Sequence, residues 1–178
     1  MIYGERIRLR AMTREDLPLF TVWFNDPEIT QGLTQYQPFS LEEEENWFNK
    51  MLKTPQEEHP LAIEIPSEAK GWELIGNCNL MNIDWRIRQA EFGIVIGAKQ
   101  HWNKGYGTEC LGLIIQHGFA TLNLNRIFLR VYENNPRAIR AYEKAGLRVE
   151  GRFRQGHYHD GKYIDVILMS ILRTEWQK

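Results

Sequence analysis

Residues 102–109 read Trp102-Asn103-Lys104-Gly105-Tyr106-Gly107-Thr108-Glu109, with two glycines one residue apart. An apolar run from Phe92 to Ile96 precedes this stretch. After it, apolar residues recur with the period of a helix, at Leu111, Ile114, Ile115, Phe119 and Leu122. The pattern predicts a strand, a glycine turn and a helix. Such a turn points consecutive backbone N–H groups in one direction and adds the positive end of the helix, so it favours binding of an anion, most often a phosphate.

Two other kinds of glycine turn bind phosphates, and the flanking residues argue against both. A dinucleotide-binding turn would have Gly or Ala at Cys110, and an acidic residue about 20 positions on, near the apolar Ile127. A P-loop would continue with Gly-Lys and Ser or Thr, and Gly107-Thr108-Glu109 lacks the lysine. When this segment is considered alone, the alternative of a turn that serves only packing and binds no ligand stays open.

A second patterned segment follows the helix. It joins a predicted strand, Arg126–Tyr132, to a helical run in which Asn135, Ala138, Tyr142 and Gly146 fit the pattern Asn-x-x-Ala-x-x-x-Tyr-x-x-x-Gly. Together the two segments resemble the core of the GNAT superfamily, the acetyl-coenzyme A-dependent N-acetyltransferases. The wording Trp-x-Lys-Gly-Tyr-x-Thr-Glu and the closing Glu175-Trp176 are similar to the branch that contains the ribosomal-protein N-terminal acetyltransferases. Two positions depart from the superfamily's pattern. Trp102 stands where Gln or Arg is usual, and Leu147 stands where Phe is usual.

The resemblance implies the acyl-CoA N-acyltransferase fold. This is an α+β fold, a three-layer αβα sandwich with a splayed, mostly antiparallel central sheet, and we expect it as a single domain over residues 1–178. It also implies that acetyl-CoA is the cofactor, with its pyrophosphate on the turn, its pantetheine arm along the preceding strand and its carbonyl on the N–H near Ile94. The residues expected to bind it are Ile94, Val95, Ile96, Gly97, Asn103, Lys104, Gly105, Tyr106, Gly107, Thr108, Asn135 and Tyr142.

Two side chains are candidates for catalysis by the same resemblance. Tyr142 would protonate the departing thiolate, and Glu91 would take a proton from the amine, often through water. Each has a simpler alternative: Tyr142 as a half-buried aromatic, and Glu91 as a surface carboxylate on an edge strand. Asn135 also fits an ordinary helix N-cap before Pro136. Tyr142 lies seven residues later, about 10.5 Å along the same helix face, so one extended ligand could contact both.

The amine acceptor is the least defined part of the expected reaction. In relatives it is bound by the loop between the first two helices and by the last hairpin, here Glu28–Pro38 and about Gln155–Lys162. The candidate substrate-binding residues are Glu28, Gln31, Tyr36 and His157, and Glu28 is also a second candidate for the base. These residues suit a polar amine, and a protein N-terminus, a polyamine, an amino sugar or an aminoglycoside all stay open. No metal is required, and His157 with His159 is read as a solvated pair.

The rest of the chain supplies recognisable elements. Capping boxes at Thr13/Asp16 and Ser40/Glu43 predict two helices, and residues 28–38 are predicted to be a loop. Strands are predicted at Arg6–Arg10, Leu61–Ile65, Leu74–Leu80, Ala90–Ile96, and, around the turn Asp160-Gly161, at Leu147–Tyr158 and Tyr163–Leu172.

Composition narrows the class of protein. A net charge of −1 gives no basic excess for nucleic acid, and no run approaches the roughly 20 apolar residues of a membrane span. Two distant cysteines and the lack of an apolar leader predict a cytoplasmic enzyme. The expected partners are the amine acceptor and, as a candidate assembly, a second copy in a homodimer. The competing hypotheses are a non-catalytic acyl-CoA-binding or sensor module of the same fold and a nucleotide-phosphate binder.

Overall fold

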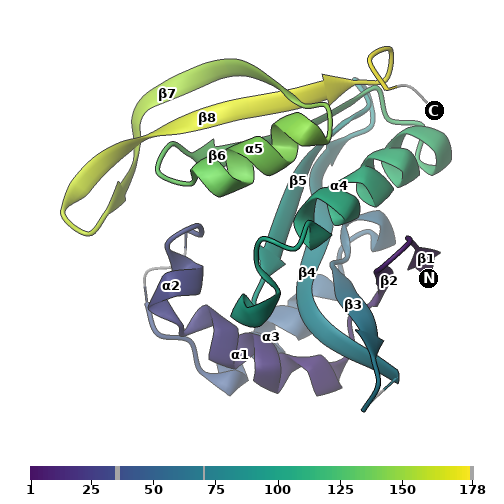
Figure 1. The fold of residues 1–178 in the computed structure, drawn as a ribbon, viewed down its shortest axis with the longest axis vertical. Helices are drawn as coiled ribbons and strands as arrows, with labels where there is room; N and C mark the ends of the chain where they lie inside the picture. The colour runs from purple at the N-terminus through teal and green to yellow at the C-terminus, as the bar shows by residue number, and fades with distance from the viewer. Residues whose placement is uncertain (35–36, 70, 177–178) are drawn as a thin grey trace.

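The computed structural model of the protein describes residues 1–34, 37–69 and 71–176. Within them one sheet runs in the order β1-β2-β3-β4-β5-β6-β8-β7, and every neighbouring pair is antiparallel except β5 with β6. This arrangement confirms the expected mixed α+β fold with a mostly antiparallel sheet (Figure 1). The strands are β1 (Ile2–Tyr3), β2 (Arg8–Ala11), β3 (Leu61–Ser67), β4 (Gly71–Asp84), β5 (Gln89–Ile96), β6 (Arg126–Tyr132), β7 (Arg148–His159) and β8 (Lys162–Leu172).

The helices begin where the sequence has capping residues. Ser40 and Glu43 form the predicted box, with the Ser40 N–H donating to Glu43 at 2.8 Å and the Glu43 N–H donating to Ser40 at 3.1 Å. The box at Thr13 is also present, and it opens a 3-10 turn that continues into α1. The helices are α1 (Leu17–Phe24), α2 (Pro27–Thr30), α3 (Leu41–Met51), α4 (Tyr106–Gln116), which ends in a π-helical turn at His117–Thr121, and α5 (Pro136–Lys144).

Some predicted boundaries are wrong, for local reasons. The predicted loop 28–38 begins with the short helix α2, because Asp26 caps it through the Glu28 N–H and Pro27 suits its first turn. The predicted strands Leu61–Ile65 and Leu74–Leu80 extend further toward each other, and β3 pairs with β4 as far as Ser67 opposite Gly71. The sequence shows no alternation of apolar and polar residues at the ends of these strands, so the prediction stopped there. The backbone hydrogen bonds between the strands continue without such alternation.

Helices lie on both faces of the sheet. Successive residues of a strand point to opposite faces, so Ile94 and the position of Gly97 face opposite ways. A Cβ at Gly107 in α4 would lie 3.9 Å from Ile94 Cδ1, whereas a Cβ at Gly97 would collide with the Trp23 ring of α1. Consequently α1 and α4 pack on opposite faces of β5, and Gly97 is required by its contact with α1.

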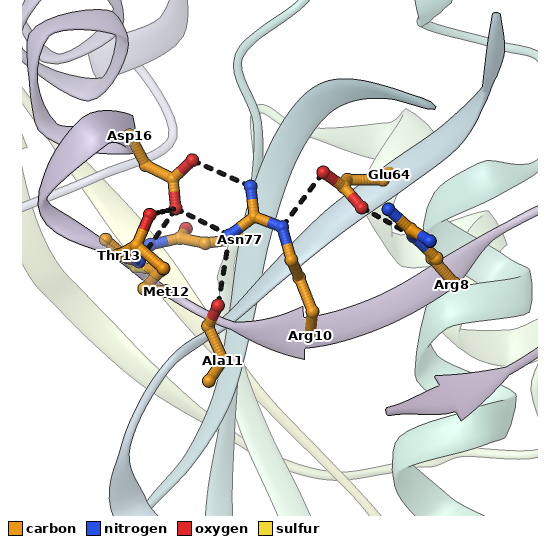
Figure 2. A network of polar contacts seen from close by, with 8 residues as sticks. All are labelled: Arg8, Arg10, Ala11, Met12, Thr13, Asp16, Glu64 and Asn77. Atoms are coloured by element: carbon orange, nitrogen blue, oxygen red, sulfur yellow. Dashed lines mark hydrogen bonds and ion pairs between the residues drawn. The ribbon is translucent and has the colours of Figure 1, made fainter. Parts of the chain in front are cut away.

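A network of charged side chains fixes the start of α1 to the sheet (Figure 2). Arg10 on β2 donates to both oxygens of Asp16 at 2.7 Å and to Glu64 on β3 at 2.9 Å, and Arg8 donates to Glu64 at 2.6 Å. Burial raises the pKa of Asp16, but the hydrogen bonds from Arg10 and Thr13 outweigh it and leave the pKa below its usual value. Because Arg10 and Thr13 donate hydrogen bonds to it, the buried Asp16 carboxylate can stay ionised.

The sheet opens between β5 and β6. These parallel strands pair at Gln89–Glu91 with Arg126–Phe128 and then part, so among the described residues no strand pairs with the second half of β5 on that side. The β7–β8 hairpin extends from the far edge of the sheet, and its tip bends toward α2 in Figure 1. A cavity lies at each of these places, one beside the opening and one at the hairpin tip. None of the described helices is long and apolar enough to cross a membrane.

Candidate active site

A cavity of about 300 Å³ lies beside the open half of β5, between the glycine turn and α5. We call it the turn cavity. It brings together most of the residues predicted to bind the cofactor: Ile94, Ile96, Asn103, Gly105, Tyr106, Gly107, Thr108, Asn135 and Tyr142. Val95, Gly97 and Lys104, which were predicted with them, are not part of its lining.

The glycine turn is held in shape by Arg6. The Arg6 guanidinium donates to the Lys104 carbonyl at 2.8 Å, and its Nε and backbone N–H donate to the Glu109 carboxylate at 2.9 and 2.8 Å. Gly105, directly before α4, has a φ of 84°, and Asn103 has a φ of 62°. Glycine adopts this left-handed conformation at the least cost, so the turn itself requires Gly105. Its shape is therefore set by contacts within the protein.

Gly107 has a different role from Gly105. Its φ is not left-handed, and a Cβ built on it would meet nothing closer than Ile94 Cδ1 at 3.9 Å. Neither the backbone nor the packing of the protein therefore demands glycine here. Because Gly107 lines the turn cavity at the first turn of α4, a side chain at this position would occupy space beside the helix N-terminus.

The register of β4 with β5 decides which backbone groups face the opening. The Gly97 N–H donates to the Ile75 carbonyl at 2.9 Å, and antiparallel pairs alternate, so Val95 and Gly97 direct their backbone groups toward β4. Ile94 and Ile96 therefore direct theirs toward the opening. The Ile96 carbonyl already accepts the Trp102 indole N–H at 2.7 Å. The groups presented to a ligand are then the N–H and C=O of Ile94 and the N–H of Ile96.

Asn135 and Tyr142 line the opposite wall of the cavity. Asn135 Oδ1 accepts the Ala138 N–H at 3.1 Å, which confirms the helix-cap interpretation and uses the oxygen rather than the amide hydrogens. Burial raises the pKa of Tyr142 to about 12; the neighbouring Cys110 adds to the rise, and Arg137 opposes it. The phenol of Tyr142 therefore stays protonated throughout the neutral range and acts as a hydrogen-bond donor.

The sequence analysis missed three cations on this wall. Arg137, Arg140 and Lys144 of α5 all line the turn cavity, and Arg137 lies over the Trp102 ring at 4.0 Å. Burial lowers the pKa of Arg137, which remains a cation at neutral pH. The spacing i, i+3, i+7 places the three residues on one helix face, and this periodicity was the available signal. The cavity thus combines backbone N–H groups, a helix N-terminus and three cations, an environment suited to a polyanion.

Glu91 is buried within the sheet and fully engaged. Its side chain accepts two hydrogen bonds from Arg130 on β6, at 2.7 and 2.9 Å, and one from Asn82 at 3.1 Å. The alternative of a surface carboxylate is therefore wrong. The residue stands at the last paired position before β5 and β6 part. Its contacts join the two strands at that point.

A second cavity, of about 550 Å³, lies between the α1–α3 connection and the tip of the β7–β8 hairpin. We call it the hairpin cavity. It is lined by Phe24, Asn25, Pro27, Thr30, Thr34, Gln37, Pro38, His157, Tyr158, His159 and Asp160. The two segments that the resemblance named as an acceptor site thus meet around one space.

The predicted acceptor residues are placed differently from one another. His157 lines the hairpin cavity, with its ring stacked on Tyr132 at a centroid distance of 4.0 Å. Glu28 is exposed and pairs with Lys99 at 3.0 Å, and Gln31 is also exposed; neither lines the cavity. Tyr36 lies outside the described residues.

Electrostatics near the cavity follow from His157. Burial and the neighbouring His159, whose ring centroid lies 6.0 Å away, lower the pKa of His157. Its Nε2 atom is buried with no hydrogen-bond partner in the described part of the chain. His157 is therefore neutral at pH 7. Among the described residues no group of three or more His, Cys, Asp or Glu side chains could hold a metal ion.

Known proteins resemble this chain along nearly its whole length. It is 30% identical over 177 residues to an uncharacterised N-acetyltransferase, p20, from Bacillus licheniformis, covering 98% of this chain and 97% of the relative. It is also 30% identical to a spermidine N(1)-acetyltransferase from Vibrio cholerae over 173 residues, covering 97% and 96% of the two chains. A crystal structure of spermidine N-acetyltransferase from Vibrio cholerae in complex with CoA and spermine has a TM-score of 0.86 at 30% identity, covering 97% of this chain and 98% of that one.

A family profile connects these likenesses with the residues described above. The profile of the acetyltransferase (GNAT) domain matches residues 6–148, which span the arginine that holds the glycine turn, the turn itself, the open strand and α5. The expected superfamily and its use of acetyl-CoA are thereby confirmed. The chain belongs to the GNAT acetyltransferase family, and it is an acetyl-CoA-dependent N-acetyltransferase.

Proposed function

We propose that the protein transfers an acetyl group from acetyl-CoA to a small primary amine held in the hairpin cavity. The observation that carries this proposal is the hairpin cavity itself, an open space of about 550 Å³ built from the two predicted acceptor segments. A space of that size suits a small molecule. A protein N-terminus, the other acceptor class predicted from the sequence, is the alternative.

The turn cavity fits the cofactor. Gly107 leaves room that a side chain would fill, the turn presents N–H groups, and Arg137, Arg140 and Lys144 offer positive charge to phosphates. The open edge of β5 offers Ile94 and Ile96 backbone groups to an amide-containing arm, and Asn135 lines the same cavity. Acetyl-CoA supplies a thioester, whose acetyl group is taken by the amine nitrogen while a thiolate leaves.

Tyr142 is the proposed hydrogen-bond donor to the leaving sulfur. With its pKa at about 12 and that of a thiol near 8.5, complete proton transfer would be uphill by about 5 kcal/mol. We therefore assign Tyr142 the role of holding its proton at Oη and donating a hydrogen bond that stabilises developing negative charge on sulfur. The Ile94 N–H, on the open edge of β5, is proposed to stabilise the carbonyl oxygen in the same manner.

Glu91 is better suited to positioning than to proton transfer. Its oxygens already accept three hydrogen bonds, two of them from a guanidinium, so the carboxylate is occupied by contacts within the protein. We propose that Glu91 and Arg130 fix the point at which β5 and β6 part. The base role predicted from the sequence stays a hypothesis.

The acceptor is to be found by an amine panel with acetyl-CoA, with release of free CoA as the readout. Because relatives are named spermidine N(1)-acetyltransferases, spermidine belongs in the panel beside monoamines, an amino sugar and a short peptide. Acetylation of at least one small amine, with a matching acetylated product by mass spectrometry, is the expected result. Turnover confined to peptides would replace the proposal with the protein N-terminus alternative.

A further inference from the structure

The segment that forms one wall of the hairpin cavity carries no charge. From Ile29 to Leu41 the sequence contains no Asp, Glu, Lys, Arg or His. The nearest acidic residues before it, Asp26 and Glu28, both pair with Lys99, at 2.7 and 3.0 Å. The residues of this wall that the structure describes therefore offer a ligand hydroxyl and amide groups, and no carboxylate.

The opposite wall, at the hairpin tip, adds little negative charge. Among the described lining residues the single carboxylate is Asp160, whose side chain is 83% exposed and lies 3.4 Å from His159 Nε2. His157, Tyr158 and His159 complete this wall, and none of the three adds a carboxylate. A carboxylate so exposed is strongly screened by water and salt.

The remaining lining is apolar or neutral. Phe24, Pro27, Pro38 and Tyr158 supply apolar and aromatic surface, and Thr30 and Thr34 supply hydroxyl groups. The His157 ring, stacked on Tyr132 at 4.0 Å, adds a polar aromatic surface to the same space. Such surfaces hold an uncharged body by packing and hydrogen bonds. A second ammonium group placed against them would find no carboxylate among the described lining residues other than the exposed Asp160.

We propose that the acceptor is an amine with a single positive charge and an uncharged, hydroxyl-bearing or aromatic body, rather than a diamine or polyamine. This inference rests on the proposed function, since it takes the hairpin cavity as the acceptor site. It separates this chain from the substrate named for its spermidine N(1)-acetyltransferase relatives. The distinction is one of charge: the described lining residues offer hydroxyl, amide and aromatic groups to the body of the amine, and Asp160 is the single carboxylate among them.

The test compares 4-amino-1-butanol with putrescine, two amines of equal length that differ in a terminal hydroxyl or ammonium group. With saturating acetyl-CoA, kcat/KM for 4-amino-1-butanol is expected to be at least tenfold higher, and tyramine is expected to exceed spermidine. The variant Thr34→Glu places a carboxylate on the exposed wall of the cavity and should shift the ratio toward putrescine by about tenfold. Thr34→Gln, its neutral control, should leave the ratio unchanged.

Calorimetric titration of both amines into the enzyme saturated with CoA measures the same selectivity without turnover. A preference for putrescine or spermidine, in rate or in binding, would overturn the inference while leaving the proposed function intact. The inference would also be overturned, with the proposed function intact, if the ratio of kcat/KM for 4-amino-1-butanol to that for putrescine were the same in Thr34→Glu and Thr34→Gln. If no small amine turns over but 4-amino-1-butanol binds more tightly than putrescine, the proposed function fails and the charge preference stands.

Discussion

Replacing Glu44 by glutamine should stabilise the protein at alkaline pH and leave its stability nearly unchanged at acidic pH. Glu44 lies on the inner face of α3 with 2% of its surface exposed, and its Oε1 has no hydrogen-bond partner in the described part of the chain. Burial raises its pKa from 4.5 to about 7. The charged form is therefore disfavoured in the folded protein and not in the unfolded chain.

The size of the effect follows from proton linkage. Below pH 4.5 Glu44 is protonated in both states and its ionisation costs the fold nothing. Between pH 4.5 and 7 the unfolded chain releases the proton while the folded protein holds it, so stability falls as pH rises. Above pH 7 the loss is constant, and a shift of this size corresponds to about 3 kcal/mol at 1.36 kcal/mol for each pKa unit. Glutamine cannot ionise, so the variant avoids that loss.

Thermal unfolding followed by circular dichroism at pH 5 and pH 8 measures the prediction. For a protein of this size about 3 kcal/mol corresponds to a rise in Tm of roughly 6–12 °C at pH 8, with little change at pH 5. Glu45→Gln is the matched control, because Glu45 is the exposed neighbour on the same helix. A rise in Tm of equal size at both pH values, or one shared by Glu45→Gln, would refute the argument from burial.

Three further predictions concern the active site. Gly107→Val should raise the Kd for CoA at least tenfold, as measured by calorimetry. Its Tm should change little, because the protein itself leaves space for a Cβ at this position. The control Gly112→Ala, where a Cβ meets nothing within 4 Å, should bind CoA normally. Tyr142→Phe should lower kcat about 10²–10³-fold with a small change in the KM for acetyl-CoA, because it removes one hydrogen-bond donor to the developing negative charge. Wild-type activity should show no loss from phenol ionisation below about pH 10. An unchanged kcat would make Tyr142 a packing residue. Glu91→Gln should cost about 1–2 kcal/mol of stability and leave the shape of the pH–rate profile unchanged, if Glu91 anchors Arg130. A deficit in kcat/KM that shrinks as pH rises would instead support Glu91 as the base.

The parts of the fold that depend on backbone conformation were predictable from the sequence. Gly105 marks a left-handed turn, Ser40 with Glu43 marks a helix start, and Asp160-Gly161 marks a hairpin, and each is found where its chemistry requires it. These signals are local, since one or two residues determine the conformation. The approximate position of the anion-binding turn followed from the same local rules.

Pairing between distant segments was not predictable in the same way. Glu91 looks the same in sequence whether its carboxylate meets water or Arg130, and that partner lies 39 positions away. The choice of Ile94 and Ile96 over Val95 and Gly97 depends on the register with β4, which a shift of one residue would reverse. The spacing of Arg137, Arg140 and Lys144 places them on one helix face. A role for that face becomes apparent only in the structure, where the three residues and the glycine turn line the same cavity.

The acceptor site shows why a family likeness and a physical argument can point to different substrates. The family profile covers residues 6–148, which include the turn, the open strand and α5 and also the α1–α3 connection, so the likeness alone does not separate cofactor from acceptor. Under the proposed function, acceptor choice depends on the charge of the α1–α3 connection and the hairpin tip, where a few substitutions change the electrostatics and leave the fold intact. The absence of charged residues from Ile29 to Leu41 is visible in the sequence. Its relevance to a ligand follows only from the structure, in which residues of this segment and of the hairpin tip line one cavity. Under the proposed function, substrate class follows from the charges that are missing around the amine, more than from those that are present around the cofactor.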